Sequence, residues 1–286
     1  MPIVSKEIEI APKVKVGGKG PFFLVAGPCV IESEEHSLRL AREIGRTCAA
    51  LGVPFIFKAS FDKANRSSGA SFRGPGLEKG LAVLRTVKKE AGVPVLSDVH
   101  EVCQVERAAE VLDVIQIPAL LCRQTDLLLE VARTMKPVNI KKGQFLSPQE
   151  MRNALDKVLS AGNDKVMLTE RGTVFGYNNL VFDVRSIPIM KRWGYPVIID
   201  ASHSVQRPGG EGLSSGGDAE FIPHIARAGM AVGADGIFLE VHDNPGAALS
   251  DKYNSLNINK LKELLAGLGR IREAVGQPGS DRSERP

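Results

Sequence analysis

The sequence predicts an α/β protein built as a TIM (β/α)₈ barrel, and three observations lead to this prediction. Short runs rich in Val, Ile and Phe recur along the 286 residues, and they are continuous, as in parallel strands covered on both faces. Amphipathic helical patterns fill the intervals between these runs. About eight β-then-α units in a chain of this length are typical of the barrel. A doubly wound open sheet is the rival, but the sequence has no Gly-x-Gly-x-x-Gly turn.

Eight apolar runs are expected to form the barrel strands: Phe22–Ala26, Pro54–Lys58, Val93–Asp98, Val114–Ile117, Val138–Lys141, Val166–Thr169, Val197–Asp200 and Gly236–Glu240. Five helices are predicted with bounds: Glu34–Ala50, Leu77–Ala91, a helix opened by Ser147 and reaching Ala161, Asp218–Val232 and Ile258–Val275. Gly52 and Gly92 follow the first two helices as expected C-caps. Ser147-Pro-Gln-Glu150 combines an N-cap serine, a proline at N1 and a capping-box glutamate.

We expect residues 1–276 to form a single barrel domain, because no linker divides the chain. The segment Ile3–Val16 alternates, with apolar residues at Ile8, Ile10, Val14 and Val16. Residues 1–18 are therefore predicted to form a short β-hairpin that caps the barrel floor. The end of the chain, residues 277–286, consists largely of Pro, Gly, Ser and charged residues, and is expected to be disordered.

Composition limits the classes of function. Hydrophobic residues make up 43% of the chain and charged residues 24%, and the net charge is only +4. That charge does not argue for a nucleic-acid or membrane partner. The four cysteines are scattered without a CxxC pair, which suits a reducing compartment. We find neither a signal-peptide pattern at the start nor an apolar run long enough to span a bilayer. A cytoplasmic protein is expected.

Polar residues gather at the predicted carboxyl ends of the strands, where barrel enzymes carry their active sites. One subset, Cys29, His203, Glu240 and Asp251, offers a thiolate, an imidazole and two carboxylates. Such a mixed donor set suits a divalent transition-metal ion. The alternatives are a cysteine packed as a small apolar residue and a histidine hydrogen-bonded in a loop.

A second subset is cationic and consists of Lys58, Lys63, Arg66, Arg123, Lys141 and Arg171. Several cations in one barrel mouth suggest a substrate with more than one phosphate or carboxylate. Solvated surface charge is the alternative, but Lys58 and Lys141 each complete an apolar strand. A lysine in that position also raises a rival chemistry, Schiff-base formation as in class I aldolases.

Long motifs that occur in a fixed order cover nearly the whole length of the chain and indicate a known family. They are Phe57-Lys-Ala-Ser-Phe-Asp-Lys-Ala-Asn-Arg-Ser-Ser68, Phe72-Arg-Gly-Pro-Gly76, Ser97-Asp-Val-His100, Gln116-Ile-Pro-Ala119, Cys122-Arg-Gln-Thr-Asp126, Asn139-Ile-Lys-Lys-Gly-Gln144, Glu170-Arg-Gly172, Phe175-Gly-Tyr-Asn-Asn-Leu180, Asp200-Ala-Ser-His-Ser-Val-Gln206, Ala228-Gly-Met-Ala-Val-Gly233 and Phe238-Leu-Glu-Val-His242. With these motifs the chain closely resembles the 3-deoxy-D-manno-octulosonate 8-phosphate synthases, also called 2-dehydro-3-deoxyphosphooctonate aldolases.

The resemblance implies a TIM-barrel enzyme, usually a homotetramer, that condenses phosphoenolpyruvate with arabinose 5-phosphate, releases phosphate and feeds lipopolysaccharide synthesis. It implies that phosphoenolpyruvate is held by Lys58, Lys63, Lys141 and Arg171, with Gln116 beside them. Asn65, Arg66 and Ser67 would hold arabinose 5-phosphate, and Arg123 would reach that phosphate in a neighbouring subunit. With Asp98 at the third strand end, the substrate-binding candidates are Lys58, Lys63, Asn65, Arg66, Ser67, Asp98, Gln116, Arg123, Lys141 and Arg171. The catalytic candidates are Lys58, Lys63, Lys141, His203 and Asp251.

The resemblance also bears on the metal. Metal-independent members of the family have Asn where this chain has Cys29, so the metal-dependent branch is implied, with Cys29, His203, Glu240 and Asp251 as ligands. The cofactor would be a divalent ion such as Mn, Fe, Zn or Co, and we hypothesise that it activates water or the aldehyde oxygen.

Three other functions remain open. The sister heptulosonate 7-phosphate synthases use erythrose 4-phosphate, but their loop typically reads Pro-Arg-Thr where this chain reads Ala-Asn-Arg-Ser-Ser. A Schiff-base aldolase and a non-catalytic sugar-phosphate-binding barrel are the remaining alternatives.

Overall fold

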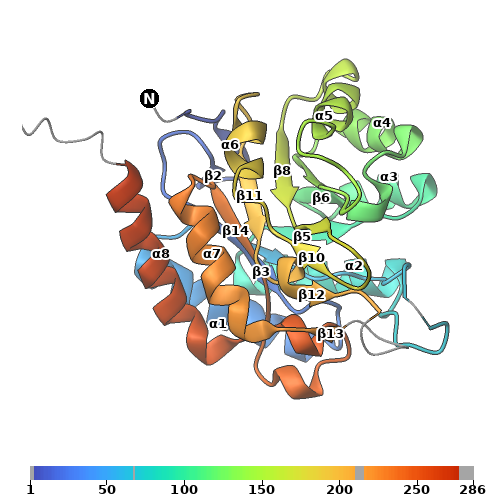
Figure 1. The fold of residues 1–286 in the computed structure, drawn as a ribbon. Coiled ribbons are helices and arrows are strands. Elements are labelled where there is room, and N and C mark those ends of the chain that lie inside the picture. Colours follow the sequence, from blue (N-terminus) through green and yellow to red (C-terminus); the bar gives the residue numbers. More distant parts are fainter. Residues whose placement is uncertain (1–2, 67, 210–215, 277–286) are drawn as a thin grey trace, which may run out of the picture.

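A computed structural model describes residues 3–66, 68–209 and 216–276, and it confirms the predicted TIM barrel. Each barrel strand pairs in parallel with the next along the chain, and the last pairs with the first, so the sheet closes into a ring (Figure 1). The barrel strands are β3 (Phe23–Gly27), β4 (Phe55–Lys58), β5 (Val95–Asp98), β6 (Val114–Ile117), β7 (Val138–Lys141), β8 (Val166–Glu170), β11 (Val197–Asp200) and β14 (Gly236–His242). Predicted and observed strand ends differ by at most two residues.

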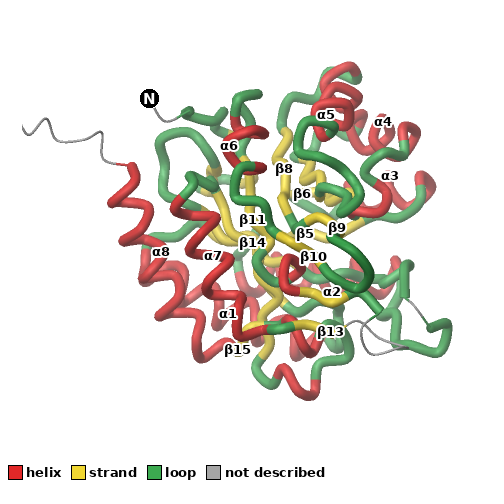
Figure 2. Tube along the Cα trace, viewed as in Figure 1, coloured by secondary structure: helices red, strands yellow, loops and turns green. Residues whose placement is uncertain are grey.

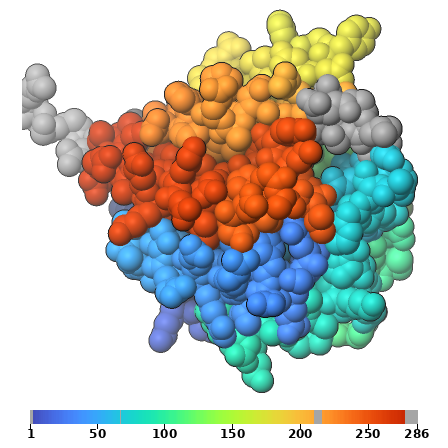
Figure 3. Space-filling model, turned by 90° about the horizontal axis from the view of Figure 1, so that it is seen from below, coloured from blue at the N-terminus to red at the C-terminus, as the bar shows by residue number. Residues whose placement is uncertain are grey.

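Helices surround this ring, as Figure 2 shows. They are α1 (Glu34–Leu51), α2 (Leu77–Ala91), α3 (Val105–Ala109), α4 (Thr125–Arg133), α5 (Met151–Ser160), α6 (Ser186–Lys191), α7 (Ile222–Ala231) and α8 (Leu261–Gly276). The last helix packs beside the first, so the two ends of the barrel wall meet on one face (Figure 3). No bounds were predicted from the sequence for α3, α4 and α6.

Helix ends test the capping predictions. Gly52 and Gly92 adopt the left-handed conformation, each with φ 66°, and confirm the two glycine C-caps. The predicted start of the helix at Ser147 is wrong, since α5 begins at Met151, but the predicted capping-box pair forms, because the amide of Glu150 donates to Ser147 Oγ at 3.4 Å. The amide of Ser147 still donates to Glu150 Oε2 at 2.8 Å. The preceding residues form a tighter turn with i→i−3 hydrogen bonds, such as Met151 N–H to Pro148 O, so the capping bonds form before the α-helix starts.

The other predicted helix starts shift for a similar reason. Short 3₁₀ helices, Ala219–Phe221 and Ile258–Lys260, precede α7 and α8. The first turn of each predicted helix is therefore wound more tightly than an α-helix.

The predicted N-terminal hairpin is also confirmed. Strands β1 (Ile8–Ala11) and β2 (Val14–Val16) pair antiparallel. The side chains of Ile8, Ile10 and Val16 pack into one buried cluster with residues that point into the barrel. The hairpin thus closes the barrel floor with apolar side chains.

The barrel interior has two layers because side chains alternate along a strand. Its lower layer is apolar and lies in the same cluster as the hairpin: Phe23, Val25, Ile56, Leu96, Val114, Met167, Ile198 and Phe238. Two residues further along most of these strands stands a buried polar residue: Lys58, Asp98, Gln116, Thr169, Asp200 and Glu240. In β7 both corresponding positions, Asn139 and Lys141, are polar. Along most strands, therefore, a residue that packs in the apolar layer is followed two positions later by a buried polar residue at the mouth.

Minor elements complete the description. Two short antiparallel pairs, β9 (Thr173–Val174) with β10 (Leu180–Val181) and β12 (Gln206–Arg207) with β13 (Gly216–Gly217), lie in the loops after β8 and β11. Strand β15 (Leu256–Asn257) pairs in parallel with the last residues of β14. No helix in the part of the chain that the structure describes is long and apolar enough to cross a membrane. The predicted disordered tail, 277–286, lies outside the described residues.

Candidate active site at the barrel mouth

The four predicted metal donors lie together at the barrel mouth, and we call them the four-donor cluster. The sulfur of Cys29 and carboxylate oxygens of Glu240 and Asp251 lie within 4.8 Å of one another. His203 Nε2 lies 3.7 Å from Glu240 Oε1 and 3.5 Å from Asp251 Oδ2. Residues separated by more than 200 positions are thus brought to one point by strand ends that meet in the ring.

A carboxylate fixes the orientation of His203. Asp200 ends β11, and its Oδ2 lies 2.8 Å from His203 Nδ1 while its Oδ1 accepts the backbone N–H of His203. A proton on Nδ1 that is donated to Asp200 leaves the lone pair of Nε2 facing the other three donors, as in many metal sites. Burial alone would raise the pKa of Asp200, but the charges of His203 and Lys141 hold it well below its usual range.

The chemistry of the cluster fits a divalent cation. Glu240 Oε2 is buried and has no hydrogen-bond partner within the described residues. Burial, and then the charge of Asp251, raise the pKa of the Cys29 thiol to about 12, and the thiol donates to Asp251 Oδ2 at 2.7 Å. A cation would replace that proton and satisfy the unpaired oxygen. One thiolate, one imidazole and two carboxylates suit a transition metal.

Two buried lysines stand beside the four-donor cluster. Lys58 Nζ donates to Glu240 Oε1 at 2.9 Å and to the carbonyl of Cys29 at 3.0 Å. Lys141 Nζ lies 2.5 Å from Asp200 Oδ2 and 3.8 Å from the centre of the Phe238 ring. Burial lowers the pKa of Lys141, although Asp200 acts in the opposite direction.

Two further cations belong to the same mouth. Burial would lower the pKa of Lys63, but electrostatic interactions with Cys29, Asp98 and other acidic groups outweigh it and raise that pKa. Arg171 is 5% exposed, and its Nη2 donates to Gln206 Oε1 at 3.0 Å. Its Nη1 is buried without a hydrogen-bond partner in the described chain. That donor is available to an anionic ligand.

The remaining strand ends carry neutral and acidic groups. Asp98 accepts from Ser60 Oγ at 2.5 Å, and its Oδ2 lies 2.9 Å from His100 Nε2. Burial alone would raise its pKa, but the hydrogen bond with His100 and the nearby lysines hold it well below its usual range. Gln116 is 3% exposed at the end of β6.

The residues predicted to bind the sugar phosphate are less closely associated with the barrel mouth. Asn65 is exposed, and Arg66 donates to the carbonyls of Phe72 and Leu249, at 3.1 and 3.3 Å. Ser67 lies outside the described residues. Arg123 is exposed in the loop before α4, and no contact described within the chain joins its side chain to the mouth.

Comparisons with known proteins identify the family of the chain. A 2-dehydro-3-deoxyphosphooctonate aldolase of Geobacter sulfurreducens is 55% identical over 268 residues, which is 94% of this chain and 98% of that protein. The proteins of that name from Geotalea uraniireducens and Trichlorobacter lovleyi are 57% and 56% identical, over 93% and 95% of this chain and 97% and 100% of their own lengths. The chain belongs to the 2-dehydro-3-deoxyphosphooctonate aldolase family. A model described as the DAHP synthetase I family also matches residues 3–276.

Membership of the aldolase family confirms the resemblance found in the motifs, while dependence on a metal stays a prediction. Sequence reasoning missed a chain of side chains across this mouth. Asn139 Nδ2 donates to Gln116 Oε1 at 3.0 Å, and Thr169 Oγ1 donates to Asn139 Oδ1 at 2.6 Å. A polar residue two positions before Lys141, on the same face of β7, was the signal that could have revealed Asn139.

Gln206 was missed as well. Its Nε2 donates to Asp251 Oδ1 at 3.1 Å, and its Oε1 accepts from Arg171. Gln206 thus links a predicted metal ligand to a predicted anion-binding residue. Gln206 lies in the loop after the seventh barrel strand, and in a loop no periodic pattern indicates the direction of a side chain.

Proposed function

We propose that this protein condenses phosphoenolpyruvate with D-arabinose 5-phosphate and water to give 3-deoxy-D-manno-octulosonate 8-phosphate and phosphate, for lipopolysaccharide synthesis. The observation that carries the proposal is one barrel mouth that holds both the four-donor cluster and the buried cations Lys58, Lys141 and Arg171. Relatives that are 55–58% identical and named for the phosphooctonate support it. Product and name refer to the same compound.

The cations suit a substrate with two anionic groups. Lys58, Lys63, Lys141 and Arg171 would hold the phosphate and carboxylate of phosphoenolpyruvate, and Gln116 would lie beside them. The unpartnered Nη1 of Arg171 supports this role. These groups would also stabilise the charge that the departing phosphate acquires, because they are fixed before the reaction begins.

The second substrate would bind at the loop that follows β4. Asn65, Arg66 and Ser67 would hold arabinose 5-phosphate, the latter two at its phosphate. The contact of Arg66 with the carbonyl of Leu249 supports this place, since Leu249 stands two residues before Asp251.

A divalent ion such as Mn, Fe, Zn or Co, held by Cys29, His203, Glu240 and Asp251, would supply Lewis-acid activation of water or the aldehyde oxygen. The contact of Asp200 with His203 Nδ1 would leave the Nε2 lone pair of His203 free to bind such an ion. His203, Glu240 and Asp251 are the candidates for moving protons.

Assembly and location follow the same proposal. The turn between β9 and β10 exposes Phe175 by 72% and Tyr177 by 98%, an apolar surface that supports contact with another subunit. We propose a homotetramer in which Arg123 reaches a neighbouring site. All four cysteines are unpaired, which supports a reducing cytoplasm.

Phosphate release tests the reaction. Purified protein is assayed with phosphoenolpyruvate and either arabinose 5-phosphate or erythrose 4-phosphate, before and after chelation and metal add-back. Activity with the pentose that chelation abolishes and metal restores is expected. Preference for erythrose 4-phosphate would move the protein to heptulosonate synthesis, and binding of both substrates without phosphate release would leave a non-catalytic barrel.

Cys29→Ala tests the metal separately. We expect a loss of activity on the order of 1000-fold, because a Lewis acid contributes several kcal/mol. Cys48→Ala, a change in the outer core behind the barrel, is the matched control and should keep full activity. Normal turnover by Cys29→Ala after chelation would reduce Cys29 to a packing residue.

One observation favours the Schiff-base alternative, namely the burial that lowers the pKa of Lys141. Borohydride with substrate would trap a covalent adduct at Lys58 or Lys141 if that chemistry occurred. We expect no adduct, because each lysine is paired with a buried carboxylate.

A further inference from the structure

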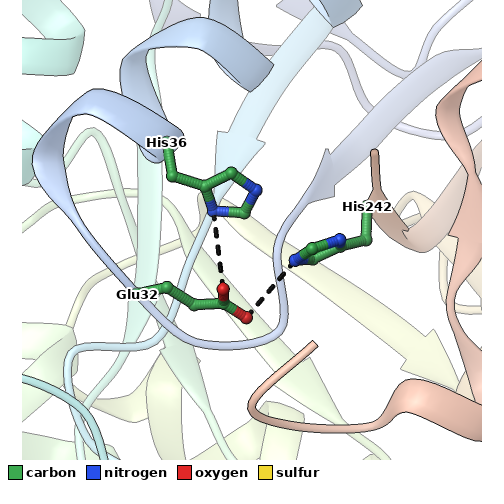
Figure 4. Close-up of side chains that lie close together, drawn as sticks. All are labelled: Glu32, His36 and His242. Carbon is green, nitrogen blue, oxygen red and sulfur yellow. Dashed lines mark ion pairs between the residues drawn. The ribbon is translucent and has the colours of Figure 1, made fainter. Parts of the chain in front are cut away.

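A second group of possible metal donors lies near the mouth but shares no residue with the four-donor cluster. Glu32, His36 and His242, which we call the His36 cluster, point toward one another from the loop after β3, the first turn of α1 and the end of β14 (Figure 4). We propose that the His36 cluster binds a second divalent transition-metal ion through one carboxylate and two imidazoles. The reaction proposed above does not require it.

The distances suit such an ion. Glu32 Oε1 lies 3.3 Å from His242 Nε2, and Glu32 Oε2 lies 3.9 Å from His36 Nδ1. Donors bound tetrahedrally with bonds of about 2.0 Å are about 3.3 Å apart. The three donor atoms lie within 4.8 Å of one another, so a small adjustment of the Glu32 carboxylate brings all of them to one ion.

The two ring nitrogens that face Glu32 are unsatisfied. His36 Nδ1 and His242 Nε2 are buried and make no hydrogen bond within the described residues. The side chain of His242 is only 7% exposed, so solvent does not readily replace the missing partner. Buried polar atoms are normally paired, and two nitrogens directed at one carboxylate can both be satisfied by a cation between them.

His36 has the partner that metal-binding histidines usually have on the other ring nitrogen. Its Nε2 lies 2.9 Å from Asp243 Oδ1, and Arg39 holds the second oxygen of that carboxylate at 2.7 Å. A proton on Nε2 donated to Asp243 leaves the lone pair of Nδ1 directed toward Glu32. His36 is therefore oriented for a metal before one binds.

His242 must change a hydrogen bond to take part. Its Nδ1 lies 3.1 Å from Asp243 Oδ1 but accepts the backbone N–H of Asn244 at 2.9 Å. Coordination through Nε2 requires a proton on Nδ1, donated to Asp243, so the Asn244 amide must turn away. This rearrangement opposes binding, and the His36 cluster has one donor fewer than the four-donor cluster. We therefore expect it to bind more weakly.

The His36 cluster is connected to the mouth through its carboxylate. Glu32 Oε1 accepts the backbone N–H of Leu249 at 2.9 Å, two residues before Asp251. An ion on Glu32 thus stabilises the loop that carries a ligand of the four-donor cluster. The expected consequence is a rise in the melting temperature at metal concentrations beyond the first equivalent.

Metal titration of the chelator-treated protein tests the proposal with Zn²⁺ and Co²⁺ alone. Elemental analysis and calorimetry should give two bound ions per chain in the unaltered protein. We expect one each in Cys29→Ala and His36→Gln, and none in the double variant. His224→Gln alters an exposed histidine outside both clusters and should leave two. Circular dichroism checks that each variant is folded.

Cobalt spectra separate the two sites. Thiolate-to-cobalt charge transfer arises only from Cys29, so this band should persist in His36→Gln and vanish in Cys29→Ala while weaker d–d bands remain. Unchanged stoichiometry in His36→Gln, or a single ion in the unaltered protein that Cys29→Ala removes, overturns the second site. Loss of one ion in His36→Gln but none in Cys29→Ala would retain it and reject the catalytic metal.

Discussion

The two interior layers of the barrel use the same strands for opposite purposes. Ile56 and Ile198 lie in the apolar layer with the floor hairpin, whereas Lys58 and Asp200, two residues further on, lie in the mouth. The apolar layer is held by close packing, and the mouth by ion pairs and hydrogen bonds that substrate or metal can exchange. A barrel therefore separates stability from chemistry by position along each strand.

Two buried ion pairs sharpen the comparison. Lys191 Nζ lies 2.9 Å from Asp235 Oδ1, at the end of the barrel opposite the mouth, and also donates to the carbonyl of Gly233 at 2.7 Å. Asp235 Oδ2 accepts the backbone N–H of Val197. In the mouth, by contrast, Lys141 shares Asp200 with His203. The Lys191–Asp235 pair makes its other hydrogen bonds to the backbone alone. The Lys141–Asp200 pair contacts the side chain of His203, which we propose binds metal.

Replacing Lys191 or Lys141 by methionine gives the largest expected effects. The first change should lower stability, and the second should lower activity. Lys191→Met leaves Asp235 buried and unpaired, so the free energy of unfolding should fall by about 3–5 kcal/mol. Lys141→Met should lower activity per folded molecule by about 100- to 1000-fold, because it removes a fixed charge from the substrate site. Urea unfolding and phosphate release measure the two quantities. A loss of specific activity in folded Lys191→Met would contradict the division between the layers.

Asp200→Asn should have an intermediate effect. Asparagine keeps the size of the side chain but removes the charge that holds the Nδ1 proton of His203. Partners of metal-binding histidines contribute about 10- to 100-fold in metal affinity, so we expect a loss of that size, measured by competition with a chelator. Asp183→Asn, at an exposed pair with Arg185, is the control. Equal affinities in the two variants would show that Asp200 does not orient the ligand.

The sequence predicted the barrel and most of the mouth for one physical reason. Parallel strands bring their carboxyl ends to one ring, so Cys29 and Glu240 could be placed together without coordinates. The link from Gln206 to Asp251 could not be predicted, because loop side chains follow no period. The position of Arg123 also stays a prediction, since its proposed contact belongs to another subunit. The His36 cluster combines a loop, a helix and a strand end, which no single pattern joins.

The smallest expected effect is a change in stability at Glu150, an exposed carboxylate on the mouth side of the barrel. It complements the test of Asp200, which is buried. Hydrogen bonds from the backbone and then the side chain of Ser147 lower the pKa of Glu150. A lowered folded-state pKa contributes stability above the unfolded value of about 4.3, and this contribution is lost as the pH falls through the folded-state pKa. The stability difference between the unaltered protein and Glu150→Ala, measured by urea unfolding, should therefore shrink on acidification from neutral pH.

Two controls separate the charge of Glu150 from its hydrogen bonds. Glu150→Gln keeps an acceptor without a titrating group, so its stability difference from Glu150→Ala should change little with pH. Ser147→Ala keeps the backbone donor, the larger cause of the shift, and should retain part of the pH dependence. If the Glu150→Ala difference stayed constant through the acid range, the capping bonds would not depend on the charge. The exposed turn would then be held by backbone geometry alone, as the apolar layer is held by packing alone.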